Sequence, residues 1–272
     1  GFIGKALIRE LLNNGWQVKA LYRTSSPRPM LNDPRIELIE GDVNNKEALL
    51  KGTQGTDVVF HCAALFREAK FSDDMYWKVN LEGTRLLLEA SKENNVGFFL
   101  FCSTTGVLGN IEHPPADVDY RYGPLDVYQE SKTEAEKLVL EWFRSGKLKG
   151  CSARPTMVWG PEDTRLFKLF KGIANKTMPI IGNGKTLCHW VLVNDLVRGF
   201  RLATEFPDTT NGNVYFIGGE RTVTLEYSMK TIADYYRVKL WKFKIPVSPI
   251  QIIGSIVEAI CKPFGIEPPI HR

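Results

Sequence analysis

Apolar and polar positions follow two different periods along the first three fifths of the chain. Short apolar or alternating runs predict strands at 17–22, 36–40, 57–61, 97–102 and 150–153. Segments with helical spacing lie between several of them and predict helices at 4–12, about 76–94 and about 125–143. Strands that alternate with helices specify a parallel sheet covered on both faces, so we predict an α/β, doubly wound fold.

This rhythm weakens after about residue 160, where stretches rich in Gly, Pro and Asn separate shorter elements. We therefore expect a sheet domain at 1–160 and a smaller lobe at 161–272 that is interleaved with the sheet. The segment 249–264 has the spacing of a hydrophobic helix. We expect it to pack on the body of the protein, with a contact to a membrane surface or a partner as the alternative.

Composition restricts the class of protein. The 272 residues are 43% hydrophobic and 24% charged, as in an average globular protein, and no apolar run approaches the length of a bilayer span. A net charge of +4, spread along the chain, does not favour nucleic-acid binding. The five cysteines are scattered and form no C-x-x-C motif, which predicts neither a metal site nor a disulfide framework. No signal peptide is recognisable, so a cytoplasmic location fits best.

The chain opens on two glycines three residues apart, at the start of a predicted helix. Gly1 and Gly4 match the second half of a phosphate-binding turn, where the backbone must approach a pyrophosphate closely. A helix in a doubly wound fold follows its own strand. We therefore expect about ten further residues upstream, with the first strand of the sheet.

Candidate chemistry lies on one helix and at the end of one strand. Tyr128 and Lys132 are four residues apart on a predicted helix, so both side chains lie on the same face. A nearby ammonium lowers the pKa of a phenol, which can then exchange a proton with an alcohol or carbonyl oxygen. Ser103, Thr104 and Thr105 follow a strand at the edge where open α/β sheets bind ligands, although such residues often cap a turn.

Taken together, these motifs resemble those of the extended short-chain dehydrogenases/reductases. That branch includes nucleotide-sugar epimerases and dehydratases, dihydroflavonol-type reductases and 3β-hydroxysteroid dehydrogenases. The matching segments occur in the family's order, at 1–4, 41–43, 59–64, 79–84, 103–104, 128–132, 154–161 and 193–196. The resemblance implies a Rossmann-type domain, a smaller substrate lobe and an NAD(P)-dependent enzyme.

The resemblance also implies a role for each matching position. Tyr128 would be the catalytic acid/base, Lys132 would lower its pKa and hold the nicotinamide ribose, and Thr104 would orient the substrate. Purely structural alternatives are that Asp42 caps a turn, that Asn80 only bonds to the backbone and that Pro155 only shapes a turn. The implied cofactor-binding residues are Gly1, Phe2, Ile3, Gly4, Arg23, Asp42, Val43, Ala63, Ala64, Leu65, Asn80, Ser103, Tyr128, Lys132, Pro155, Met157 and Val158.

Arg23 bears on the choice of dinucleotide. It follows the strand at 17–22, where NAD-preferring members of the family usually carry an acidic residue, and the sequence shows no carboxylate until Asp33. A guanidinium suits a 2′-phosphate, which favours NADP over NAD. The alternative is that Arg23 stacks on the adenine without selecting a phosphate.

For the substrate, the predicted contacts are Phe66, Thr105, Arg165 and Trp190. The two aromatic residues favour an apolar secondary alcohol or ketone as a small-molecule substrate. Arg165 and Lys185 could instead bind a diphosphate, which keeps a nucleotide-sugar epimerase or dehydratase open. A second alternative is a non-catalytic dinucleotide-binding protein. By analogy with the family, a homodimer would form through the helices at 76–94 and 125–143.

Overall fold

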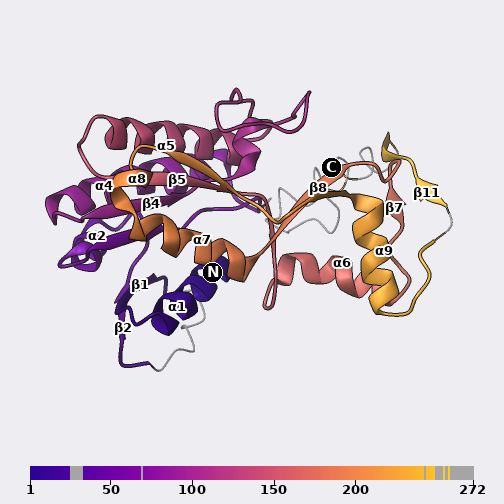
Figure 1. The fold of residues 1–272 in the computed structure, drawn as a ribbon, viewed down its shortest axis with the longest axis horizontal. Coiled ribbons are helices and arrows are strands. Elements are labelled where there is room, and N and C mark those ends of the chain that lie inside the picture. Colours follow the sequence, from indigo (N-terminus) through magenta and orange to yellow (C-terminus); the bar gives the residue numbers. More distant parts are fainter. Residues whose placement is uncertain (25–32, 69, 242, 249–253, 255–256, 258–272) are drawn as a thin grey trace. The chain divides into compact units, whose positions relative to one another are not determined.

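The computed structural model describes residues 1–24, 33–68, 70–241, 243–248, 254 and 257. These residues form two compact units, each built from separate stretches of the chain (Figure 1). The first unit comprises 1–67, 73–156 and 193–217, and the second comprises 68–72, 157–192 and 218–272. The predicted hydrophobic helix at 249–264 falls almost entirely outside the described residues.

A four-stranded parallel sheet forms the centre of the first unit, in the order β3-β4-β5-β9, and a parallel pair, β1 and β2, forms a second sheet. The five strands expected before residue 160 are confirmed with small changes at their ends. The strand that completes the larger sheet was not predicted. The bounds are β1 Val18–Tyr22, β2 Ile36–Glu40, β3 Val58–His61, β4 Phe98–Cys102, β5 Gly150–Pro155 and β9 Val214–Ile217.

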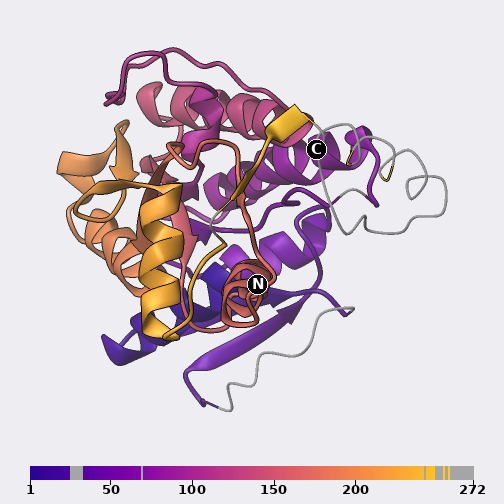
Figure 2. The ribbon, with the colours of Figure 1, turned by 90° about the vertical axis from the view of Figure 1, so that its right-hand side faces the viewer.

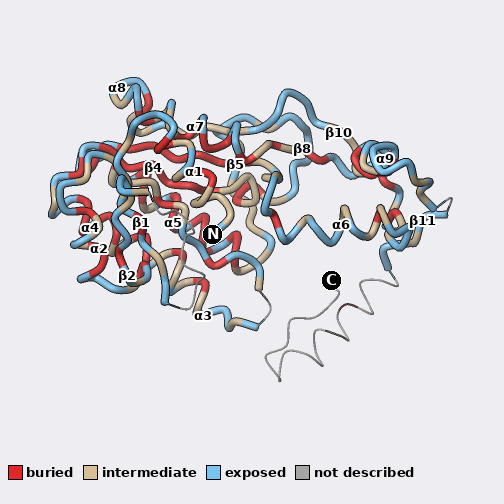
Figure 3. Tube along the Cα trace, turned by 90° about the horizontal axis from the view of Figure 1, so that it is seen from below, coloured by how far each residue is buried: buried red, intermediate tan, exposed pale blue. Residues whose placement is uncertain are grey.

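Helices cover both faces of this sheet (Figure 1, Figure 2). On one face Phe99 and Phe101 of β4 pack with apolar residues of α2, α4 and α5 in a buried cluster. On the other, α7 contacts β4 and β5, and packs against α1. Figure 3 shows buried residues following β4 and β5. The helices are α1 Phe2–Asn13, α2 Lys46–Thr53, α4 Gly83–Glu93, α5 Val127–Arg144, α7 Val193–Glu205 and α8 Pro207–Thr210.

The single helix expected over about 76–94 is interrupted. It consists of α3 (Asp73–Tyr76), a π-helical turn η1 (Trp77–Glu82) and α4. The π turn adds a residue to one helical turn, a local change that apolar periodicity does not reveal and that is often found at functional sites. The buried Asn80 lies within it, 1% exposed.

In the described part of the second unit, small sheets pack with the helices α6 and α9. One sheet has the order β10-β8-β6, and the other pairs β11 with β7. Its core contains Ile173, Ile180, Met229 and Ala233. No helix in the described part of the chain is long and apolar enough to cross a bilayer. The elements are β6 Met157–Trp159, α6 Thr164–Ala174, β7 Ile180–Ile181, β8 Leu187–Leu192, β10 Thr222–Thr224, α9 Leu225–Tyr235 and β11 Lys244–Ile245.

Candidate active site

The carboxyl end of β4 carries two hydroxyl side chains. Ser103 continues the strand, and its backbone N–H donates to the Ala153 carbonyl at 2.7 Å. Its buried hydroxyl has no hydrogen-bond partner among the residues that the structure describes. The Thr104 side chain accepts a hydrogen bond from the Gly106 N–H at 3.1 Å and so caps the short 3₁₀ helix η2 (Thr105–Leu108). A turn-capping role for Thr104 is therefore present.

Tyr128 lies in the first turn of α5, next to these hydroxyls. The helix begins after Asp126, whose carboxylate accepts from the Gln129 N–H at 2.8 Å. Tyr128 is 8% exposed, and the nearby Thr104 hydroxyl lowers the pKa of its phenol. The Phe66 ring packs edge-on against the phenol ring, with the centroids 4.9 Å apart. The phenol thus sits at the sheet edge, where the sequence predicted it.

Arg67 is the cation that faces the phenol ring. Its guanidinium carbon lies 5.8 Å from the centroid of Tyr128, and the guanidinium forms an ion pair with Asp126 at 2.8 Å. Arg67 is not among the predicted site residues, although it directly follows Phe66, which is one of the predicted substrate contacts.

Lys132 is fully buried one turn further along α5. Its ammonium donates to the Cys102 carbonyl at 2.8 Å and lies 3.9 Å from the centroid of the Phe101 ring. Burial lowers the pKa of Lys132 to about 8, because the charged form loses its hydration.

The pKa of Tyr128 is raised above its usual value, mainly by burial and then by Cys102, while Arg67 and Thr104 lower it. The expectation that Lys132 lowers this pKa stays a prediction, because the raised value has other causes in the structure. The ammonium is directed at a backbone carbonyl, and desolvation of the phenol is the larger effect. A raised pKa keeps the phenol protonated at neutral pH, so Tyr128 is suited to donate a proton.

Asn80 connects the end of the segment after β3 to α5. Its amide oxygen accepts from the Leu65 N–H at 2.8 Å, and its amide nitrogen donates to the Leu65 carbonyl at 3.1 Å and to the Ser131 hydroxyl at 2.9 Å. These contacts fix the path of the chain just after Ala63 and Ala64, which are exposed. Asn80 therefore braces the sheet edge through both backbone and side-chain contacts.

The residues expected to hold a dinucleotide fit that group. The N-cap of α1, Gly1, has no side chain that would cover the helix N-terminus, and the first turn contains no acidic residue. The exposed alanines and the unpartnered Ser103 hydroxyl lie at the carboxyl ends of β3 and β4. Asp42 accepts from the Asn44 N–H at 2.8 Å, so its turn-capping role is also present. Val43 is buried against Gly83, where a Cβ atom would approach it to 2.6 Å.

Arg23 is exposed directly after β1. The Glu40 carboxylate of the neighbouring strand β2 lies beside this strand end, although it comes 17 residues later in the sequence. β1 and β2 pair with Tyr22 opposite Glu40. The Glu40 carboxylate accepts from the Tyr22 hydroxyl at 3.1 Å and from the Thr24 hydroxyl at 2.8 Å. Both a cation and an anion are thus available where the adenosine ribose is expected.

The predicted substrate residues divide between the two units. Phe66 and Thr105 belong to the first, where the Thr105 hydroxyl donates to the Pro155 carbonyl at 3.3 Å. Arg165 and Trp190 belong to the second, as do Met157 and Val158 of β6. Trp190 lies opposite Met157 in the sheet, and its indole N–H donates to the Ser228 hydroxyl at 2.8 Å. Arg165 donates to both oxygens of Asp163 at 3.0 Å, which neutralises much of its charge.

An aromatic pocket of about 400 Å³ opens in the second unit between β6 and α6. The Trp159 and Phe170 rings stack there, with centroids 6.3 Å apart and planes 17° apart. Phe167 and Tyr236 also line it, and Phe167 is 61% exposed. The sequence analysis did not predict this pocket, although Trp159 and the lining residues Leu166, Phe167 and Phe170 of α6 lie within twelve residues of one another.

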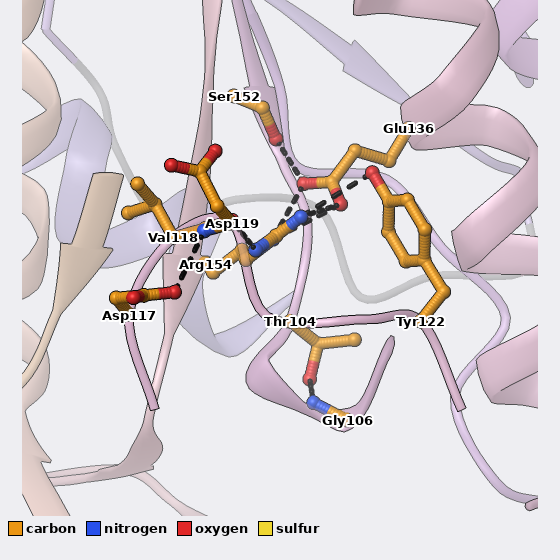
Figure 4. Close-up of polar contacts among 9 residues, drawn as sticks. All are labelled: Thr104, Gly106, Asp117, Val118, Asp119, Tyr122, Glu136, Ser152 and Arg154. Carbon is orange, nitrogen blue, oxygen red and sulfur yellow. Dashed lines mark hydrogen bonds and ion pairs between the residues drawn. The ribbon is translucent and has the colours of Figure 1, made fainter. Parts of the chain in front are cut away.

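A buried ion pair supports α5 from the side of β5 (Figure 4). Arg154 is 2% exposed, and its guanidinium donates from Nε and Nη2 to the Glu136 carboxylate at 3.0 and 2.9 Å. Its remaining donors reach the Val118 carbonyl at 2.9 Å and the Tyr122 hydroxyl at 3.3 Å. The network ties the loop around 117–122 to α5 and β5. One feature of the sequence points to this network: Glu136 lies four residues after Lys132 and so on the same face of the helix.

Comparison with known proteins identifies relatives. The sequence model of the NAD dependent epimerase/dehydratase family matches residues 1–218. The chain is 29% identical over 278 residues to a 3-beta-hydroxysteroid dehydrogenase of Mycolicibacterium neoaurum, covering 94% of this chain and 72% of that protein. It is 28% identical over 257 residues to the decarboxylating sterol-4-alpha-carboxylate 3-dehydrogenase of Bos taurus, covering 90% and 70%. The crystal structure of gox2253 superposes with a TM-score of 0.83 at 29% identity, covering 100% and 83%.

Proposed function

The chain belongs to the NAD-dependent epimerase/dehydratase family, and we propose that it is an oxidoreductase that reduces a ketone, or oxidises the corresponding secondary alcohol, on a largely apolar polycyclic substrate. The observation that carries the proposal is the buried Tyr128 phenol, which lies near Thr104 at the carboxyl edge of the parallel sheet and has a pKa above its usual value. The steroid- and sterol-directed activities named for two relatives support the substrate class.

A bound dinucleotide would supply the hydride chemistry, and the chain supplies the proton and the geometry. Tyr128 holds the proton that passes to the carbonyl oxygen, and the Thr104 hydroxyl orients that oxygen. Residues 1–4, the two alanines after β3, Ser103 and Lys132 would hold the dinucleotide. Because Asn80 and the Arg154–Glu136 pair fix α5 and its neighbouring segments, the phenol stays aligned with the sheet edge.

We infer from its aromatic pocket that the second unit recognises flat apolar groups. A steroid nucleus is flat, and the stacked Trp159 and Phe170 offer a flat apolar surface. Removal of the indole in Trp159→Ala should raise the KM for a steroid ketone about tenfold, since the lost contact area is that of one aromatic side chain.

The test is the oxidation of reduced dinucleotide with a panel of steroid ketones and nucleotide sugars. We expect turnover with the ketones, a raised KM in Trp159→Ala, and no change in Trp241→Ala, whose indole lies outside the pocket and donates to the Lys176 carbonyl. Turnover of nucleotide sugars alone would replace this proposal with the epimerase or dehydratase activity of the family.

We further propose NADP(H) as the preferred dinucleotide, with Arg23 binding the 2′-phosphate. Arg23→Ala should then raise the KM for NADPH at least tenfold and change that for NADH little, because NADH lacks the phosphate. Glu40→Gln should shift the preference further toward NADPH by removing a nearby negative charge. Equal affinity for both dinucleotides, unaffected by Arg23→Ala, would contradict the assignment. A homodimer and a cytoplasmic location remain proposals that the family resemblance supports.

A further inference from the structure

Two cysteines occupy equivalent places at the ends of neighbouring strands in the first unit. β3 and β4 are paired in parallel as far as His61 opposite Phe101, and Cys62 and Cys102 are the residues that directly follow this last pair. Neighbouring strands lie about 4.8 Å apart, and register partners project from the same face of the sheet. This spacing falls within the Cα separation of disulfides, roughly 4.4 to 6.8 Å. Both cysteines are free, and each thiol acts on the pKa of the other.

The surroundings of the pair make one thiol acidic. The neighbouring Cys62 thiol lowers the pKa of Cys102, and the Lys132 ammonium acts in the same direction. Cys62 is partly exposed, which gives a small oxidant access to the pair. By contrast, burial raises the pKa of Cys151 to about 12, and Cys151 lies opposite Leu100 in the sheet, away from any cysteine in the register.

We propose that Cys62 and Cys102 are a peroxide-sensitive modification site that closes to a cross-strand disulfide. The Cys102 sulfur attacks one oxygen of hydrogen peroxide, the O–O bond breaks, and a sulfenic acid forms with release of one water. The Cys62 sulfur then attacks the Cys102 sulfur, the S–O bond breaks, and a second water leaves. The two thiols lose two electrons and two protons in total, and the peroxide is reduced to two waters.

Disulfide closure would alter the backbone that carries the dinucleotide-binding residues. Ala63 directly follows Cys62, Ser103 directly follows Cys102, and the Cys102 carbonyl accepts the Lys132 hydrogen bond. We therefore expect oxidation to raise the Kd for the dinucleotide at least tenfold, reversibly. This consequence rests on the proposed function, whereas formation of the disulfide does not.

Peptide mapping of the purified protein tests the disulfide directly. After treatment with hydrogen peroxide and alkylation of remaining thiols, a non-reduced tryptic digest should contain peptide 52–67 linked to peptide 93–121, with the mass of two fewer hydrogens. Dithiothreitol should release the link. Cys62→Ser and Cys102→Ala should abolish it, whereas Cys151→Ala, the matched control on the adjacent strand, should retain it.

The outcomes separate the two parts of the inference. Oxygen addition to Cys62 or Cys102 without a cross-link, or cross-links that survive in Cys62→Ser, would overturn the disulfide. A cross-link that leaves the dinucleotide Kd within twofold would establish the modification and overturn its effect on binding. Absence of dinucleotide binding in the untreated protein would count against the proposed function and leave the peptide result unaffected.

Discussion

At the residue scale, burial decides the protonation states of the candidate site. The phenol of Tyr128 and the ammonium of Lys132 both lose hydration on burial. The pKa of Tyr128 therefore rises and that of Lys132 falls, so that the neutral form of each is favoured. The phenol therefore stays protonated at neutral pH, and the Lys132 ammonium titrates close to neutral pH. Sequence spacing correctly placed both residues on one helix, but it could not predict the desolvation, which depends on the packing of Phe66 and Phe101 around them.

The pKa of Lys132, about 8 against 10.5 for an unfolded chain, predicts a pH-dependent stability. Below pH 8 the ammonium is charged in both states, and the cost of burying it is fully present. Between pH 8 and pH 10.5 the unfolded chain binds more protons than the folded chain, so the free energy of unfolding rises with pH. The free energy of unfolding of the native chain relative to Lys132→Met should rise by on the order of 3 kcal/mol over this interval. Parallel pH profiles in urea unfolding would contradict the burial argument.

At the scale of elements, α5 is held from both sides along its first half. Asn80 of the π turn contacts it through Ser131, and Arg154 of β5 contacts it through Glu136. These residues lie far apart in the sequence, so their meeting depends on strand order and on the interruption of the helix at η1. Apolar periodicity identified α5, the helical segment around Asn80 and β5, but it carries no information about which polar residues on them become partners.

The buried Arg154–Glu136 pair predicts a large cost for breaking it on one side only. Glu136→Gln should lower the free energy of unfolding by about 3–5 kcal/mol, because it leaves a buried guanidinium without its counter-ion. The matched control is Glu134→Gln on the same helix, whose exposed ion pair with Lys137 contributes at most about 1 kcal/mol.

Urea unfolding of both variants and of Glu136→Leu/Arg154→Met checks this prediction. The double variant should recover part of the loss, since it removes both charges together. A loss in Glu136→Gln no larger than that in Glu134→Gln would show that the pair does not anchor α5.

At the scale of the whole molecule, neither unit is continuous in the sequence, because the chain passes from the first unit to the second after residue 156 and returns to the first at residue 193. The alternation of strands and helices correctly predicted the parallel sheet before residue 160. It missed that β9 completes this sheet and that α7 covers it, because Val214–Ile217 is a short apolar run whose partner, β5, is set by tertiary packing. The aromatic pocket was missed for a similar reason, since Trp159 and α6 form a concave surface that residue spacing alone does not predict.

The most direct test of the account follows deuterium from the cofactor. Reduced dinucleotide deuterated at the nicotinamide C4 is incubated with the protein and a steroid ketone, and the alcohol product is analysed by mass spectrometry. The account predicts deuterium on the new carbinol carbon, with the rate reduced at least a hundredfold in Tyr128→Phe and unchanged in Tyr120→Phe. Products without deuterium, or equal transfer in Tyr128→Phe, would contradict the proposed hydride transfer or the role of Tyr128 as proton donor.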